Sequence, residues 1–465
     1  MHILWLVLLV LLPSISVTAD HFSPYDEQRL VFIFAVGMML LFSHRQLATP
    51  APGLLFLSFA LLGLLSVAFS MTPSYASLEW SLWICLISFV VLLSRQLGDE
   101  VTICRLVLPL IAVGMLLYGI VSLSTLFIAW HYEGAPFWPA LIHRFANVRF
   151  FNQYQSWLLP LLPALLYSTV VMIRPGLLKT LLVLYSIFFF SLLFYSGGRG
   201  TMVGLLAAGI VVLILFRRPG MRWSAIMIGY LSMGLLLAYH VFPQSSMAGV
   251  SSRIISQAMS NDASVLLSKR DVLWQQSLGM VEEQPWLGSG PMGFAAIGSS
   301  IAAHPHNFPL QLAAEWGLPA TLALFSALGY ALLTWLVFAY RRVKDPQCPP
   351  WEKTYIISLS ASLITAGVHS LVSGIVVMPI SQAMLVLVSS MALGWYMRYQ
   401  QAPSQPTRLL LLWRPLAIAA AIWLMAMTTH QVIYFDEIMK HAELSQPGYQ
   451  PRFWSRGHLH HHVVE

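Results

Sequence analysis

Residues 181–194, with the sequence LLVLYSIFFFSLLF, form an almost uninterrupted apolar run. A short turn at residues 196–200, SGGRG, separates this run from a second one at residues 205–215, LLAAGIVVLIL. A third run of the same kind lies at residues 54–65. Such runs predict membrane-spanning helices, because a transmembrane β-strand alternates apolar and polar side chains and these segments do not.

The composition extends this prediction to the rest of the chain. Hydrophobic residues make up 58% of the 465 residues and charged residues only 9%, with a mean hydropathy of +0.72. A soluble globule could not bury so many apolar side chains in its own core. We therefore predict an all-α, polytopic transmembrane bundle of about 12–13 spans with one large periplasmic loop. The predicted spans are 3–19, 29–43, 52–70, 78–95, 105–130, 155–173, 180–196, 201–216, 223–242, 308–339, 354–376, 380–397 and 409–429.

The distribution of Lys and Arg predicts the orientation of the bundle. With the N-terminus in the cytoplasm, fifteen of the 25 Lys and Arg residues fall on inner connections and helix ends. This is the distribution that the positive-inside rule expects. The net charge of +7 is thereby explained by membrane topology, and no nucleic-acid partner is predicted. The fifteen residues are Arg45, Arg95, Arg105, Arg174, Lys179, Arg217, Arg218, Arg222, Arg341, Arg342, Lys344, Lys353, Arg398, Arg408 and Arg414.

We predict four parts along the chain. Residues 1–243 hold transmembrane helices with short loops, 244–306 form the large periplasmic loop, 307–430 hold further transmembrane helices, and 431–465 form a polar tail. The first span resembles a signal sequence in length but has no Lys or Arg before its apolar part, which favours a retained helix. The three cysteines provide no outward pair for a disulfide.

The large loop contains a segment that predicts a helix on the membrane surface. Ser268 and Asp271 have the spacing of a capping box, and Pro285 marks the end of the helix. Lys269 and Arg270 then lie at the positive end of the helix dipole, where an anion is favoured. We therefore predict an anion pocket at this end. The apolar side of the helix comprises Leu273, Trp274, Leu278 and Val281.

A polar stripe begins where this loop returns to the membrane. Asn307 is placed to cap the following helix, in whose first turn Pro309 is tolerated. Gln311 and Glu315 continue the stripe at intervals of four residues. An ionisable side chain inside an apolar span is costly to desolvate and points to function. We interpret Asn307, Gln311 and Glu315 as substrate-binding residues.

His304 and His306 come directly before this stripe. A neutral imidazole at the membrane face can accept a proton from a hydroxyl nucleophile, so we interpret His306 as a catalytic base and His304 as its neighbour in the substrate site. Two other interpretations are an interfacial histidine without chemistry and a zinc ligand pair. Because no cysteine and few carboxylates lie nearby to complete a metal site, we predict neither metal nor cofactor.

Arginines on two other outward turns are further candidates. Arg199 lies in a tight, glycine-rich turn that lets a ligand approach the backbone, although an arginine that merely extends to the interface would look the same. Arg149 and Asn152 lie among aromatic residues, a pattern that suits sugar binding and equally an interfacial aromatic belt. The histidines at 458 and 460–462 are typical of a solvated tail or a partial affinity tag.

Taken in order, these motifs resemble those of the bacterial O-antigen ligase and polymerase family of membrane glycosyltransferases. The resemblance covers residues 145–330, and outside that range only the pattern of spans is similar. The matching motifs are Ser196-Gly197-Gly198-Arg199-Gly200, then Arg270-x-x-x-Trp274 with Pro285-x-x-Gly288-x-Gly290-Pro291, then His306-Asn307, Leu310-Gln311 and Glu315-x-Gly317.

The resemblance implies a metal-independent, inverting transfer of a glycan from undecaprenyl diphosphate to an acceptor hydroxyl, at the periplasmic face of the bacterial inner membrane. Guanidinium groups stay charged and bind phosphate oxygens bidentately, so they can replace a metal ion, and the sequence has no Asp-x-Asp motif to hold one. We assign Arg199 and Arg270 to the diphosphate and His306 to the acceptor hydroxyl. The expected substrate-binding residues are His304, Asn307, Gln311, Glu315, Lys269, Arg149 and Asn152.

Several acceptors remain open within the family. They are a sugar of the lipid A core, another glycan chain, and a Ser or Thr of a protein such as pilin. An odd number of spans favours protein transfer because it places the tail outside, whereas the short polar tail favours the lipid A-core ligase, which we prefer. A lipid-linked oligosaccharide transporter is the alternative from another class, but the charged candidates lie at the outer face rather than at the bilayer midplane.

Overall fold

The computed structural model describes residues 7, 10–14, 22–42, 53–132, 142–168, 175–242, 269–400, 412–438 and 451–455. All regular secondary structure in these ranges is helical, which confirms the all-α class. Most of the first predicted span, the loop up to Ser268 and the terminal histidines lie outside the described residues. The helices are α2 (Pro24–Leu41), α3 (Gly53–Ala68), α4 (Pro73–Ser94), α5 (Glu100–Thr102), η1 (Ile103–Val107), α6 (Leu108–His131), α7 (Val148–Leu158), η2 (Leu159–Leu161), α8 (Leu162–Leu165), α10 (Pro175–Ser196), α11 (Arg199–Val241), α14 (Arg270–Glu283), α15 (Gly293–Ile297), α16 (Phe308–Trp316), α17 (Leu318–Lys344), α18 (Pro350–His369), α19 (Pro379–Arg398) and α20 (Trp413–Ile433).

Seven helical segments within the described ranges are long and apolar enough to cross a membrane. They lie at 73–94, 100–131, 176–196, 199–241, 318–344, 379–398 and 413–433, and the shorter α3 is also apolar. The chain is therefore a multi-pass membrane protein.

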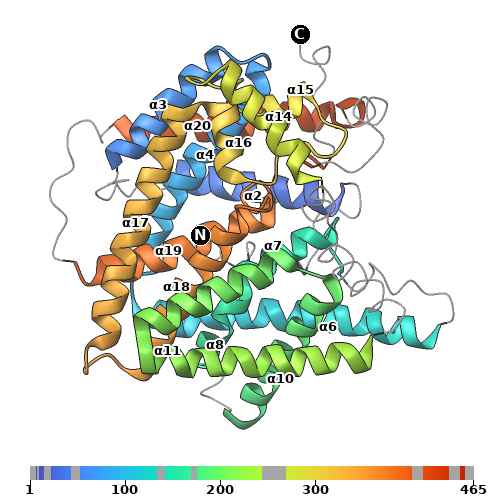
Figure 1. Cartoon of the computed structure of the whole chain (residues 1–465), viewed down its shortest axis with the longest axis vertical. Coiled ribbons are helices and arrows are strands. Elements are labelled where there is room, and N and C mark those ends of the chain that lie inside the picture. Colours follow the sequence, from blue (N-terminus) through green and yellow to red (C-terminus); the bar gives the residue numbers. More distant parts are fainter. Residues whose placement is uncertain are drawn as a thin grey trace.

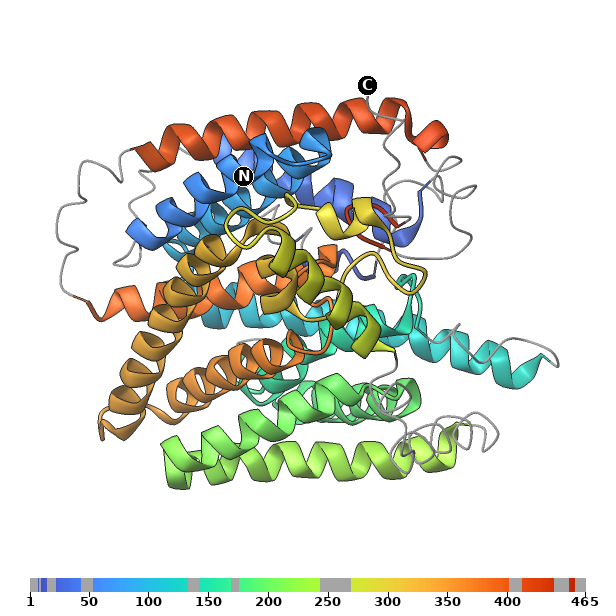
Figure 2. The ribbon, with the colours of Figure 1, turned by 45° about the horizontal axis from the view of Figure 1, so that its top comes forward.

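The helices stack in layers across the molecule (Figures 1 and 2). In Figure 2, α20 lies along one side and α11 along the other, with α4, α19 and α18 between them. Each of these helices packs against the next one in that order. Helices α14 and α15 lie apart from this stack and pack on α16.

Helix α11 is a helical hairpin whose two halves correspond to the predicted spans 201–216 and 223–242. The chain reverses at Arg217, which has a left-handed φ of 48°, just before Pro219. Gly220 permits the reversal, since a Cβ there would lie 2.5 Å from the carbonyl oxygen of Val212. Figure 2 shows the two halves lying side by side.

The predicted span 308–339 is wrong as a single helix, because the chain breaks at Gly317 into α16 and α17. Gly317 has a φ of +82°, a conformation that is costly for a residue with a Cβ. The glycine-rich turn of the large loop packs directly on this break, where a Cβ on Gly288 would lie 2.7 Å from the Gly317 nitrogen. The Ser66 hydroxyl donates to the Leu287 carbonyl at 2.6 Å and thereby ties α3 to the same junction.

The predicted span 155–173 is also interrupted. Helix α7 ends at Leu158, a 3-10 turn follows at Leu159–Leu161, and α8 ends at Leu165. Pro160 and Pro163 lack the backbone N–H groups that a continuous helix needs, and their rings disfavour α-helix before them.

Basic residues gather at the end of the bundle that the sequence predicts to face the cytoplasm. Arg342 binds the Glu352 carboxylate at 2.7 Å and the Asp345 carboxylate at 2.5 Å. Arg398 lies 4.0 Å from Glu100. The bend of α11 and the C-terminal ends of α17 and α19 lie together toward the left of Figure 2.

Candidate active site

The turn that carries Arg199 is held in place by α7. The side-chain amide of Asn152 donates to the Ser196 hydroxyl at 2.6 Å and to the Gln155 carbonyl oxygen at 3.0 Å. The Thr201 hydroxyl donates to the Asn152 backbone carbonyl at 2.7 Å. The side chain of Asn152 is buried, and its hydrogen bonds hold the turn in position.

Helix α7 also brings a second arginine to this region. Asn147 caps the helix by accepting from the backbone N–H of Arg149 at 2.9 Å. The side chain of Arg149 is exposed at the first turn, and its pKa is lowered by desolvation and by the charge of Arg199. Two residues 50 positions apart are thus electrostatic neighbours.

Helix α14 contributes the third arginine. The helix begins at Arg270, with Lys269 as its N-cap residue in a left-handed conformation (φ 60°) and without a side-chain cap hydrogen bond. The predicted capping box, with Ser268 as N-cap, is therefore wrong by one residue. The helix ends at Glu283, before Pro285, as predicted. Lys269 is exposed at the positive end of the helix.

The loop with the two histidines lies against α14. The indole N–H of Trp274 donates to the Pro305 carbonyl at 3.1 Å. Asn307 caps α16 as predicted, since its side-chain oxygen accepts from the Leu310 N–H at 3.0 Å. Its amide group donates to the Leu371 carbonyl at 3.1 Å, which anchors the loop to the end of α18.

His306 is held in an unusual backbone conformation at this point. Its φ of 55° is left-handed, which is uncommon and costly for a residue with a side chain. The ring packs edge-on against His304, with 4.2 Å between centroids, and the His306 N–H donates to the Nδ1 of His304 at 3.3 Å. Among the described residues, the Nδ1 of His306 has no hydrogen-bond partner.

Two of the arginines, Arg270 and Arg149, act electrostatically on this histidine, and Arg199 acts on both of them. Burial and the charges of Arg149 and Arg199 lower the pKa of Arg270 to about 10. Burial, followed by the charges of Arg270 and Arg149, lowers the pKa of His306 to about 3. The pKa of His304 is also lowered, first by burial. Both imidazoles are therefore neutral at physiological pH, in a region with a strong positive potential.

A third histidine, His369 on α18, belongs to the same cluster and was not identified from the sequence. Its Nδ1 lies 2.7 Å from the Ser156 hydroxyl, and its ring packs under Gly200, where a Cβ would meet the ring. It is also one of the groups that affect the pKa of His306. The signal that could have found it is an ionisable residue inside a predicted span.

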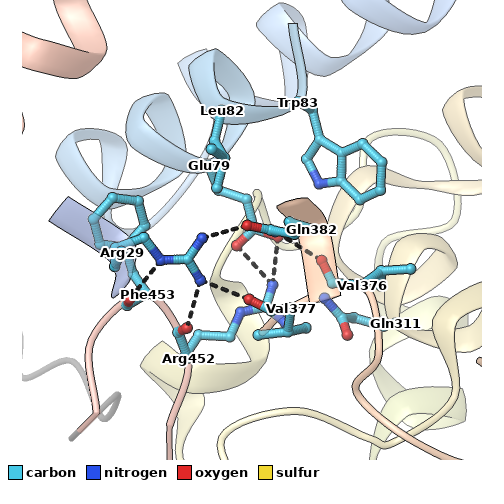
Figure 3. Close-up of a pocket in the computed structure, with 10 residues that line it drawn as sticks. All are labelled: Arg29, Glu79, Leu82, Trp83, Gln311, Val376, Val377, Gln382, Arg452 and Phe453. Atoms are coloured by element: carbon cyan, nitrogen blue, oxygen red, sulfur yellow. Dashed lines mark hydrogen bonds and ion pairs between the residues drawn. The ribbon is translucent and has the colours of Figure 1, made fainter. Parts of the chain in front are cut away.

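Two residues of the predicted polar stripe point away from the histidines. Gln311 donates to the Glu315 carboxylate at 3.4 Å and lines a small cavity with Arg29, Glu79 and Arg452 (Figure 3). Glu315 is fully buried and accepts from Arg452 at 2.5 Å. The structure thus separates the candidates into an arginine–histidine cluster and a second, buried ionic cluster.

The buried ionic cluster draws on residues that sequence reasoning did not connect. Arg452, from the predicted polar tail, is only 1% exposed and also binds the Glu79 carboxylate of α4 at 2.7 and 2.8 Å. Glu79 could have been recognised as a charged residue inside an apolar span. Nothing in the local sequence around Arg452 indicates its burial. Within the described ranges, no group of three or more His, Cys, Asp or Glu side chains is arranged to hold a metal ion.

A comparison with protein families supports the resemblance seen in the motifs. A family model described as O-antigen ligase matches residues 184–325, the segment that carries Arg199, Arg270 and His306. No curated protein matches the chain. Residues 184–325 of this chain are therefore similar to the O-antigen ligase family.

Proposed function

We propose that the protein transfers a glycan from undecaprenyl diphosphate to an acceptor hydroxyl on a lipid A-core sugar. The observation that carries this proposal is that the charges of Arg270 and Arg149 act on a buried, neutral His306 and that the charge of Arg199 acts on both of these arginines. A diphosphate carries the negative charge that guanidinium groups bind through paired hydrogen bonds. The site would face the periplasm of the inner membrane, because the basic helix ends lie on the other side of the bundle.

In this proposal Arg199 and Arg270 hold the diphosphate, and Arg149 and Lys269 strengthen the field around it. The mutual repulsion that lowers the pKa of Arg270 disappears when phosphate oxygens lie between the guanidinium groups. Arginine can donate two parallel hydrogen bonds to one phosphate, which stabilises the charge that develops on the leaving group. No metal ion is needed for this step, and we expect transfer to continue in the presence of EDTA.

His306 is proposed as the base that receives the acceptor proton. The acceptor oxygen attacks the anomeric carbon as its proton passes to the neutral imidazole. The bond between that carbon and the phosphate oxygen breaks, and the electron pair leaves with undecaprenyl diphosphate. Attack opposite to the leaving group inverts the anomeric configuration. His304 and Asn307 keep the His306 ring in place through the contacts described above.

Donor binding should also prepare the base. In the free enzyme burial, together with the positive charges of Arg270 and Arg149, holds the pKa of His306 at about 3, so the imidazole is a weak base. A bound diphosphate offsets this positive field and raises the pKa toward its ordinary range. The acceptor is therefore activated only when a donor is present, which limits unproductive proton transfer.

The described part of the tail favours a lipid A-core acceptor over a protein acceptor. Residues 452–455 are buried among the helices and so belong to the bundle, not to a separate outward domain that could recruit a protein. A protein O-oligosaccharyltransferase remains the second candidate, since both acceptors present a hydroxyl group.

The test is a chromosomal deletion complemented with the wild-type gene or with His306→Ala. We expect the deletion to remove glycan from lipopolysaccharide but not from pilin, and we expect His306→Ala to leave the defect unrepaired although the variant inserts normally in the membrane. Normal glycan transfer by His306→Ala would overturn the base assignment. Loss of glycan from pilin alone would replace the lipid A-core acceptor with a protein.

A further inference from the structure

The segment at residues 451–455 is bound between helices that are far away in the sequence. The Arg29 side chain on α2 donates to the Phe453 carbonyl at 3.1 Å, and the Tyr25 hydroxyl donates to the Arg452 carbonyl. Asp26 accepts from the backbone N–H of Ser455 at 2.7 Å and from its hydroxyl at 2.5 Å. These contacts fix the backbone of the segment on both sides of Arg452.

This fixed backbone directs the Arg452 guanidinium between two carboxylates, and Figure 3 shows the one from Glu79. Glu79 of α4 and Glu315 of α16 both bind the same terminal nitrogen of Arg452, at 2.7 Å and 2.5 Å. The Nε atom of Arg452 lies 3.1 Å from the sulfur of Met292. Arg452 and Glu315 are almost completely buried, so neither charge has water to replace its partner.

Helix α16 connects this cluster to the candidate active site. Glu315 lies in the last turn of this nine-residue helix, and Asn307, next to His306, caps its first turn. Glu315 also accepts from the Phe294 N–H at 3.2 Å, so its carboxylate joins α15 and α16 to Arg452. A short helix moves as one unit, and a shift at its C-terminal end therefore reaches the histidine loop.

We propose that Arg452 is a positioning residue, which holds Glu315 and with it α16 so that His306 meets the acceptor hydroxyl in the reactive geometry. The inference rests on the proposed function, because it assigns Arg452 a role in that same transfer. Arg452 does not touch the substrate in this proposal. It sets the position of the catalytic base through Glu315, while the arginines on α7, α11 and α14 bind the donor independently of it.

The test compares Arg452→Lys with Arg342→Lys in the full-length protein, reconstituted with lipid-linked donor and lipid A-core acceptor. Arg342 is a matched control, because it also bridges two carboxylates, Glu352 and Asp345, but at the other end of the bundle. A lysine at 452 keeps the charge but loses the Nε contact with Met292 and the rigid planar group that holds one terminal nitrogen between the two glutamates.

We expect Arg452→Lys to lower kcat on the order of a hundredfold, as a small misplacement of a catalytic group does. The affinity for the donor should stay unchanged, and Arg342→Lys should keep its kcat. Equal kcat values for the two variants would overturn the proposal. A weaker donor affinity in Arg452→Lys would also overturn it, because a positioning role confined to α16 leaves the arginine site intact.

A second variant covers the case in which Arg452→Lys does not fold. Glu315→Gln retains the shape of the side chain and removes one of the two carboxylates, and we expect the same loss of kcat at unchanged donor affinity. A loss that only follows the fraction of folded protein, measured by size-exclusion chromatography and thermal unfolding, would show a purely structural role. His306→Ala distinguishes a failure of the proposed function from a failure of this inference. Normal transfer by His306→Ala refutes the proposed function. If His306→Ala is inactive and Arg452→Lys is fully active, only this inference is refuted.

Discussion

The Nδ1 atom of His369 lies 2.7 Å from the hydroxyl of Ser156, deep between α18 and α7. The same hydroxyl lies 2.9 Å from that of Thr201, in the first turn of α11. Three helices thus meet in one chain of polar contacts directly beneath the turn that carries Arg199. The position of that arginine depends on this chain.

Ser156→Ala should therefore both destabilise the protein and reduce transfer. The substitution leaves a buried nitrogen of His369 without its partner, which costs about 1–3 kcal/mol. Thermal unfolding in detergent and a transfer assay measure the two effects. Ser191→Ala is the control, because the Ser191 hydroxyl is buried but bonds only within its own helix, to the Phe188 carbonyl. Equal stability of the two variants would contradict the importance of the polar chain.

Replacing Arg199 or Arg270 by Lys should weaken donor binding although the charge is retained. A hydrogen bond to a charged group contributes about 1.5–3 kcal/mol, so the loss of one bond to the diphosphate predicts roughly 10- to 100-fold lower affinity. Equilibrium binding of a lipid-linked donor measures this change. Arg341→Lys, in the last turn of α17 at the opposite end, should bind normally. If Arg199→Lys and Arg270→Lys both bind the donor with unchanged affinity, the assignment of these arginines to the diphosphate is wrong.

The pH dependence of kcat and of kcat/KM should differ on the acid side. In the free enzyme His306 has a pKa of about 3 and stays neutral as the pH falls from 7 to 5, so it does not reduce kcat/KM in that range. Bound diphosphate raises this pKa, so His306 becomes protonated at a higher pH in the complex and kcat falls earlier. Steady-state profiles between pH 4 and 8 provide the measurement. If kcat and kcat/KM fall at the same pH on the acid side, the donor does not affect the pKa of His306.

Gly374→Ala should displace the loop that carries His304 and His306. A Cβ at this position would lie 2.7 Å from the Nε2 atom of His304, so the ring must move, and His306 is packed against it. Overpacking of this kind costs about 1–3 kcal/mol, and we expect a lower kcat together with a lower Tm. Gly367→Ala is a suitable comparison because a Cβ there meets nothing within 4 Å. The same kcat in both variants would contradict the tight packing.

Much of the fold could be predicted from local patterns. Long apolar runs indicate helices whatever their neighbours are, and the Asn307 cap depends only on residues within one turn. The break at Gly317 was missed because an apolar segment on both sides of a glycine looks like one span. Its cause is tertiary, since the Gly288 turn packs on the same backbone. In the predicted span 155–173, by contrast, the prolines within residues 159–163 did indicate that the helix is interrupted.

In the candidate site, too, some residues could be predicted from local sequence patterns and others depend on tertiary contacts. Arg199, Arg270 and His306 stand out because polar residues are rare in an apolar chain, and their motifs lie in one continuous part of the sequence. The pairing of Arg452 with Glu79 joins residues 373 positions apart, and no periodicity or spacing encodes such a contact. A charged residue in a polar tail looks solvated until the surrounding helices are known.

The burial of residues 452–455 has a consequence for the biogenesis of the protein. The ribosome makes Glu79 and Glu315 before it reaches Arg452, so this counter-ion becomes available to the two carboxylates only after residue 452 has been made. A nascent chain therefore already carries Arg199, Arg270 and His306 while the ionic cluster at the end of α16 is unfinished. In this arrangement the ionic contacts that join α16 to Arg452 form only after residues 452–455 have been made and have packed among the helices.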